Sequence, residues 1–290
     1  MQLVTWNIQW CRGADGRVDP ARIVADARAF ADFDVLCLQE VAANFPALEG
    51  SRGEDQFALL AEQLPGYTAV PGIAVDVPAP DGSRRRFGNM ILSRYPVLQV
   101  LRHQLPWPAD PGVKSMPRML LEATVAAPFG PIRVMTTHLE YYSQVQRAAQ
   151  VEALRRCHAE ACARALGAAG AGAARRREEA QDPFQNQPQT VSAILTGDFN
   201  FRSTDRLHAR MTGGFDDPVV PELEDAWQRV HGTLERPPTL GVYDHEQWPE
   251  AFACDFIWTS RDLGPRLRAV EIDGGTAASD HQPVRVELAP

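Results

Sequence analysis

The chain has 290 residues, of which 44% are hydrophobic and 23% are charged, an ordinary globular composition that can bury a sizeable core. Acidic residues outnumber basic ones by 37 to 29, and the net charge of -8 argues against a broad nucleic-acid-binding surface, which needs clustered cations. Five cysteines without zinc-type spacing, a strand-like start and no apolar run of about 18 residues argue against a metal finger, a signal peptide and a membrane span. We therefore expect a soluble, cytoplasmic protein with free thiols, and the composition implies no protein partner.

The first half of the chain alternates between β-forming and helix-forming segments. Strands are predicted at residues 2–8, 35–38, 67–77 and 87–93. The first helix is predicted to begin after Asp19, which caps it, with Pro20 at the first helical position, and a second helix at residues 56–64. Asp81 and Gly82 are a hairpin signal, so the arginines at 84–86 are predicted to lie in a solvated loop.

The second half continues the same alternation. Strands are predicted at residues 120–125, 132–137, 191–195, 252–259, 267–272 and 284–288. Ser143 is predicted to cap a long helix that ends near Leu166, and residues 167–190 are predicted to form a flexible surface loop. Consecutive hairpins with helices between some strands indicate an α/β protein with two mixed sheets stacked on each other and helices outside. No break in composition divides residues 1–290, so we expect one domain.

Polar side chains recur at the ends of strands that otherwise have buried character. They are Asn7, Glu40, Asn89, His138, Asp198, Asn200, Asp255, Asp280 and His281. A single group of this kind is usually a satisfied structural residue, because burial without a partner is costly. So many at strand ends are better explained by convergence on one site.

The residue types in this set limit the reaction. The sequence has no serine elbow and no glycine-rich phosphate loop, which argues against covalent serine chemistry and P-loop chemistry. Oxygen ligands favour a hard cation such as Mg²⁺ or Mn²⁺ over zinc. A hard cation beside amides and histidines suits phosphoryl transfer, in which developing charge must be stabilised.

Seven short motifs in order resemble the endonuclease/exonuclease/phosphatase superfamily, from about residue 2 to about residue 288. The motifs are Trp6-Asn7, Gln39-Glu40, Gly88-Asn89, Thr137-His138-Leu139, Gly197-Asp198-Phe199-Asn200, Asp255-Phe256-Ile257 and Ser279-Asp280-His281. Each motif alone is weak, but seven in the same order at strand edges form a specific signal. The resemblance implies a four-layer α/β/β/α sandwich with the site at one edge of the paired sheets, and Mg²⁺ or Mn²⁺ as cofactor.

The resemblance also implies roles for five residues around the metal and the attacking water. Glu40 would be the main metal ligand, Asn7 would help to hold the metal or its waters, and Asp280 would lie in or near the metal shell. Asp198 would orient or deprotonate the water, and Asn200 would hold that water or a phosphate oxygen. Alone, Glu40 would be a helix-terminal charge and Asp198 a turn residue.

The histidines are implied to act on the phosphate. His281 would contact it as a hydrogen-bond donor or acid/base group, with Asp255 fixing the orientation and tautomer of the ring. His138 would contact a non-bridging phosphate oxygen. Whether Asp198 or His281 takes the proton of water stays open.

Four further residues are weaker candidates for substrate binding. Asn89 belongs to one of the motifs, and Arg118 precedes a strand where the family often has a phosphate-facing arginine; a surface ion pair explains Arg118 almost as well. Tyr141 would line a substrate pocket or pack at the start of a helix. Arg202 would meet a second phosphate or a headgroup.

The substrate is predicted from departures from named relatives. Gln9 stands where abasic-site endonucleases usually carry an aspartate, and Glu40 is followed by Val41-Ala42 rather than a Thr-Lys pair. We therefore expect hydrolysis of a small phosphorylated metabolite, nucleotide or lipid headgroup. A DNA endonuclease or exonuclease is the alternative, and a catalytically silent protein that binds a phosphorylated ligand is a further one. Monoester or diester specificity, the number of metal ions and the oligomeric state stay open.

Overall fold

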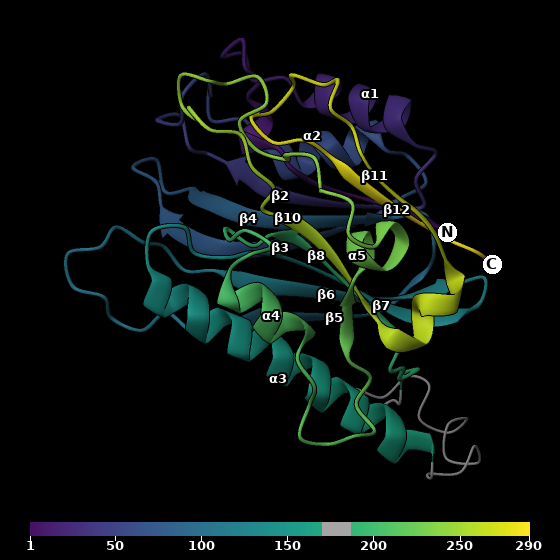
Figure 1. Cartoon of the computed structure of the whole chain (residues 1–290). Coiled ribbons are helices and arrows are strands. Elements are labelled where there is room, and N and C mark those ends of the chain that lie inside the picture. The colour runs from purple at the N-terminus through teal and green to yellow at the C-terminus, as the bar shows by residue number, and fades with distance from the viewer. Residues whose placement is uncertain (170–186) are drawn as a thin grey trace.

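The structure is a computed structural model that describes residues 1–169 and 187–290. Within these ranges, the strands form two six-stranded mixed sheets that lie face to face (Figure 1). The first sheet has the order β11-β12-β1-β2-β4-β3, with bounds Leu267–Ile272, Val284–Leu288, Gln2–Asn7, Val35–Ala43, Arg84–Ser93 and Thr68–Pro78. The second has the order β5-β6-β7-β8-β10-β9, with bounds Val97–Gln104, Met119–Ala127, Gly130–His138, Ala193–Asp198, Asp255–Ser260 and Leu223–Asp225. In each sheet the central pair is parallel, β1 with β2 and β7 with β8, and the other pairings are antiparallel.

Alternation along the strands separates three apolar layers. Successive side chains of a strand point to opposite faces. Leu3 of β1 therefore lies between the two sheets with Leu121 of β6, whereas the next residue, Val4, lies on the outer face of the first sheet. Leu120 of β6 likewise lies on the outer face of the second sheet. Each sheet is thus buried on both faces.

Helices cover the two outer faces. α1 (Pro20–Phe30) and α2 (Gln56–Gln63) pack on the first sheet, and α3 (Gln144–Ala169) and α4 (Arg206–Thr212) pack on the second (Figure 1). The Asp19 side chain accepts hydrogen bonds from the amides of Ala21 and Arg22, and Pro20 follows it at the first helical position, as predicted. The four layers α/β/β/α agree with the sequence-based prediction. The described helices also include α5 (Ala226–His231) and the short 3-10 helices η1 (Gln9–Cys11) and η3 (Arg261–Arg266).

Several sequence-based boundaries were wrong. The arginines at 84–86 belong to strand β4 and pair with residues 76–78 of β3. The ion pairs Arg84–Asp76 and Arg86–Asp55, both 2.7 Å, satisfy two of the three charges on the strand. β2 continues to Ala43 instead of ending at Leu38. α3 ends at Ala169, so residues 167–169 are helical, and residues 170–186 of the predicted loop lie outside the described residues. β5, β9, α4 and α5 were not predicted, because each is short or only half-buried.

Two further features bear on the predicted environment. All five cysteines lie in described segments and are free thiols, as expected. None of the helices in the described ranges is both long enough and apolar enough to cross a membrane.

Candidate active site

The topology brings the predicted site residues to one edge of the sandwich. Asn7 is the last residue of β1, and His138 and Asp198 are the last residues of β7 and β8. The register of the second sheet sets His138 opposite Asp198, and Asp198 opposite Asp255, which opens the antiparallel strand β10. His281 lies just before β12, the antiparallel neighbour of β1. Ends of parallel strands and starts of antiparallel ones therefore meet at this edge.

A β-bulge directs Glu40 toward the same edge. The register of β2 with β4 shifts between Leu38 and Val41, so Gln39 and Glu40 together oppose the single residue Asn89. Glu40 has a left-handed backbone, with φ of 62°. Gln39 stays between the sheets and donates from its Nε2 to the Thr136 hydroxyl at 2.7 Å. The extra residue thus lets Gln39 point into the sandwich while Glu40 points to the site.

The amide of Asn7 lies at the centre of the cluster. Its Nδ2 donates to Glu40 Oε1 and to Asp198 Oδ2, both at 3.1 Å, and lies 3.4 Å from His281 Nε2. Its Oδ1 accepts from the Gln9 backbone amide at 3.1 Å. Glu40, Asp198 and His281 come from different strand ends and lie around this one side chain. Asn7 would have to turn its amide to offer an oxygen to a metal.

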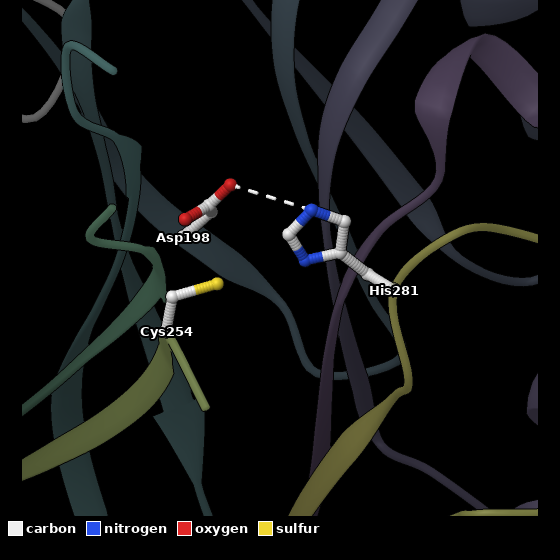
Figure 2. A group of neighbouring side chains, drawn as sticks. All are labelled: Asp198, Cys254 and His281. Carbon is white, nitrogen blue, oxygen red and sulfur yellow. Dashed lines mark ion pairs between the residues drawn. The ribbon is translucent and has the colours of Figure 1, made fainter. Parts of the chain in front are cut away.

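His281 is held from several sides. Its Nδ1 lies 2.9 Å from Asp255 Oδ2, and its Nε2 lies 3.6 Å from Asp198 Oδ2 (Figure 2 shows the latter pair). The Thr239 hydroxyl donates to the same Asp255 oxygen at 2.6 Å and accepts from the Asp255 amide at 3.2 Å. Trp6 Nε1 donates to the His281 carbonyl at 2.9 Å. The ring is therefore fixed with Nε2 toward Asp198.

His138 contacts two of the same carboxylates. Its Nδ1 is 3.7 Å from Glu40 Oε1, and its Nε2 is 3.4 Å from Asp198 Oδ2. Arg118 is buried and donates from Nε to Glu140 Oε2 at 3.3 Å. The alternative of a surface ion pair for Arg118 was therefore wrong, because both members of the pair are enclosed.

Burial and charge perturb the titration of this cluster. Burial and the nearby Asp280 raise the pKa of Glu40 to about 7, and burial together with Asp255 raises the pKa of Asp198 to about 6. Burial lowers the pKa of His281, but the carboxylates of Asp255 and Asp198 outweigh it and hold that pKa well above its usual value. Burial, with the charge of Arg118, lowers the pKa of His138 well below its usual range.

The cluster fits a hard divalent cation. Four buried or mostly buried carboxylates, those of Glu40, Asp198, Asp255 and Asp280, face one imidazolium, so negative charge is in excess. Burial is the main cause of the raised pKa values of Glu40 and Asp198, and the charges of Asp280 and Asp255, respectively, add to it. Carboxylate oxygens are the ligands that Mg²⁺ and Mn²⁺ prefer, and a bound cation would relieve the repulsion.

Asn200 and Asp280 border the cluster. The Asn200 backbone N–H donates to Asp198 Oδ1 at 2.9 Å, and the Asn200 side-chain Nδ2 donates to the Leu139 carbonyl at 2.9 Å. Asp280 Oδ2 accepts from Gln9 Nε2 at 2.8 Å and from Trp248 Nε1 at 3.0 Å. Asn200 thus fixes one Asp198 oxygen and leaves the other facing Asn7 and the histidines.

The weaker candidates lie outside these central contacts. Asn89 is buried at the bulge and donates to the Met119 carbonyl at 3.4 Å. Tyr141 is exposed and packs edge-on against Trp248, with ring centroids 5.8 Å apart. Arg202 is paired with Glu250 at 3.1 Å.

Sequence reasoning assigned no role in the site to five residues that contact it: Gln9, Glu140, Thr239, Trp248 and Cys254. Gln9 was considered only as a difference from abasic-site endonucleases. Thr239 fixes Asp255, and Gln9 links Asn7 to Asp280. Cys254 was assigned only as a free thiol, and its position next to Asp255 was the one available signal. Its Sγ lies 3.6 Å from Asp255 Oδ2, and burial, with the charge of Asp198, raises the thiol pKa well above its usual value.

Comparisons with known proteins agree with the geometry. The model of the Endonuclease/Exonuclease/phosphatase family matches residues 4–281. None of the curated proteins compared with the chain matches its sequence significantly. An endonuclease/exonuclease/phosphatase of known structure from Beutenbergia cavernae DSM 12333 is 27% identical, with TM-score 0.64, and the match covers 100% of this chain and 72% of that one.

Two more distant structures share the fold. The mannosyl-6-phosphatase Bt3783 of Bacteroides thetaiotaomicron VPI-5482 is 17% identical, with TM-score 0.61 and 100% coverage of both chains. TDP2 of D. rerio, complexed with a single-strand DNA product, is 18% identical, with TM-score 0.64 and coverage of 100% of this chain and 99% of that one.

Proposed function

The chain belongs to the endonuclease/exonuclease/phosphatase family, and we propose that it is a divalent-metal-dependent hydrolase of a small phosphorylated metabolite. The observation that carries this proposal is the meeting of Glu40, Asp198 and His281 around the Asn7 amide. Glu40 would hold Mg²⁺ or Mn²⁺, with Asn7 and Asp280 in or near its shell. The cation would supply charge stabilisation for the phosphate in the transition state.

The remaining residues divide the work on water and phosphate. Asp198 Oδ2 faces His138 and His281 and would orient the attacking water. His281, held by Asp255 as a cation, would donate a hydrogen bond to a phosphate oxygen as charge develops there. His138 is held neutral and would donate to a non-bridging oxygen, and Asn200 would hold the water or a phosphate oxygen.

A pocket beside this cluster favours a small leaving group. It has a volume of about 470 Å³, and Gln9, the partner of Asp280, lines it together with Trp10. Three carboxylates and one guanidinium also line it, and Arg12 is already paired with Glu49 at 2.9 Å. This acidic lining would repel further phosphates and accept an uncharged, hydroxyl-rich group. The similarity to a mannosyl-6-phosphatase supports a sugar phosphate within this class.

DNA hydrolysis is the second candidate, because a structure with the same fold is TDP2 complexed with a single-strand DNA product. The arginines that could grip a polyanion are largely paired: Arg84 with Asp76, Arg86 with Asp55 and Arg202 with Glu250. Strong salt dependence of binding to single-stranded DNA would favour this candidate. A flat response to salt would favour the small substrate.

The decisive experiment is hydrolysis of p-nitrophenyl phosphate, bis-p-nitrophenyl phosphate, sugar phosphates, lipid phosphates and single-stranded DNA with and without metal. We expect a chelator to abolish turnover and Mg²⁺ or Mn²⁺ to restore it. Asp198→Asn and His281→Ala should lose most activity while keeping the wild-type melting temperature within a few degrees. Turnover that is unchanged by the chelator would contradict the metal role. Binding of a phosphorylated ligand without any turnover would establish the alternative of a catalytically silent binding protein.

A further inference from the structure

The site contains a set of soft and borderline donors that the proposed reaction does not use together. Candidate metal-ligating atoms of Asp198, Cys254 and His281 all lie within 4.8 Å of one another, and all three residues are buried (Figure 2). Figure 2 shows the Cys254 sulfur directed toward the imidazole, with the Asp198 carboxylate on the same side. Neither the hydrolysis of a phosphoester nor the binding of a hard cation requires a thiol here.

The donor chemistry selects a different class of metal from the one at Glu40. Thiolate, imidazole and carboxylate together form a ligand set for Zn²⁺, whereas Mg²⁺ and Mn²⁺ avoid sulfur. Zn–S and Zn–N bonds of about 2.3 and 2.0 Å place tetrahedral ligands about 3.3–3.8 Å apart. The pair of Asp198 Oδ2 and His281 Nε2, at 3.6 Å, already has this spacing, and Cys254 Sγ, which lies within 4.8 Å of its partners, would have to move closer.

The surroundings favour a cation at this position. Asp255 Oδ2 is in hydrogen-bond contact with His281, Thr239 and Cys254. The buried Asp255 Oδ1, in contrast, has no hydrogen-bond partner among the described residues. This buried carboxylate oxygen without a hydrogen-bond partner belongs to the residue next to Cys254, and it adds to the negative charge that a cation would balance.

We propose that Asp198, Cys254 and His281 form a binding site for a thiophilic divalent cation such as Zn²⁺, which inhibits the enzyme when it is occupied. The metal forms bonds to the Cys254 sulfur and to a ring nitrogen of His281, and the thiol proton and one proton of the His281 imidazolium are released to solvent. Asp198 and His281 are then metal ligands, so Asp198 can no longer orient the attacking water and His281 can no longer donate a hydrogen bond to the phosphate. The binding step stands independently, whereas inhibition rests on the proposed function.

Another thiol–imidazole pair in the chain provides a matched control. Cys162 Sγ lies 3.7 Å from His158 Nε2 and is also buried. The guanidinium of Arg133 lies 3.9 Å from that sulfur and would repel a cation. We therefore expect no strong metal binding at Cys162.

The test uses Co²⁺ as a spectroscopic probe and Zn²⁺ as the inhibitor. Wild type and Cys162→Ser should show the thiolate-to-cobalt charge-transfer band, and Cys254→Ser and Cys254→Ala should lose it. With saturating Mg²⁺ present, the half-inhibitory Zn²⁺ concentration should rise at least about tenfold in the Cys254 variants, each compared with its own activity without zinc. Circular dichroism confirms that the variants are folded, and two replacements guard against a defect peculiar to one of them.

An unchanged cobalt band in both folded Cys254 variants would overturn the binding site. Equal zinc sensitivity in wild type and Cys254→Ala would overturn the inhibition and assign it to displacement of Mg²⁺ at Glu40. If no phosphoester is hydrolysed at all, the proposed function fails, and the cobalt spectrum still decides whether the thiol site exists.

Discussion

Replacement of Asp255 by asparagine isolates the charge that holds His281. The Asp255–His281 contact is 2.9 Å long and buried on both sides. Opposite charges about 4 Å apart interact by about 4 kcal/mol at an effective dielectric constant of about 20. At about 1.4 kcal/mol per factor of ten, full loss of that term would lower the rate about a thousandfold. Asp198 still faces the ring at 3.6 Å and retains part of the stabilisation, so we expect kcat to fall between about a hundredfold and a thousandfold.

The assay is steady-state hydrolysis of the best phosphoester at saturating Mg²⁺, with thermal unfolding of each variant. KM should change little, because the imidazolium contact strengthens as charge develops on the phosphate. Asp225→Asn is the matched control, since Asp225 pairs with His208 at 2.8 Å in an equally buried contact away from the site. It should lower stability and leave kcat within a few-fold. A value of kcat for Asp255→Asn within about threefold of wild type would refute the reasoning, as would an equal loss in Asp225→Asn.

Three other predictions concern positioning, backbone and pH. Thr239→Val removes the hydroxyl that donates to Asp255 Oδ2 at 2.6 Å, so kcat should fall about tenfold, measured beside the melting temperature. Gly197→Ala would set a Cβ 1.8 Å from the Thr137 carbonyl at φ of +138°, so denaturant unfolding should show a loss above about 4 kcal/mol, or the variant should fail to fold. Burial, and next the charge of Arg133, lowers the pKa of His158 to about 4. Between pH 6.5 and 4, His158 is therefore protonated in the unfolded chain but not in the folded chain. As the pH is lowered through this range, the free energy of unfolding should decrease by at most about 3 kcal/mol. Urea midpoints measured against pH should show this decrease in wild type, and His158→Gln should lack this contribution.

The sequence predicted the part of the site that follows from strand ends. Asn7, His138 and Asp198 each close a strand, and the carboxyl ends of paired parallel strands must share an edge of the sheet. The order of hairpins and helices predicted two mixed sheets. The four-layer arrangement was predicted from the resemblance that the motifs carry. The prediction succeeded where local periodicity determines position in the fold.

The residues that were missed depend on contacts between distant segments. Thr239 reaches Asp255 because Leu240 bridges both Phe252 and His281 in an irregular stretch, and such a stretch has no hydrophobic period. The alternative of a surface ion pair for Arg118 was wrong because its partner, Glu140, follows a different strand and the sequence does not show that the two residues meet. Charge alone does not show whether an arginine is enclosed.

Backbone strain gives an independent argument that this edge is functional. Glu40 and Asn200 have φ of 62° and 52°, and the residues of η1, which follow Asn7, have φ of 43°, 44° and 61°. Left-handed backbone at residues other than glycine costs on the order of 1–3 kcal/mol at each position and persists only where surrounding contacts hold it. Glu40 combines that cost with a carboxylate that is largely enclosed, with 17% of its side chain exposed, and whose pKa is raised to about 7. For stability alone, a glycine or an apolar side chain would suit this position in the bulge better. The presence of a strained, poorly solvated carboxylate that faces Asn7 therefore favours a site that binds a cation.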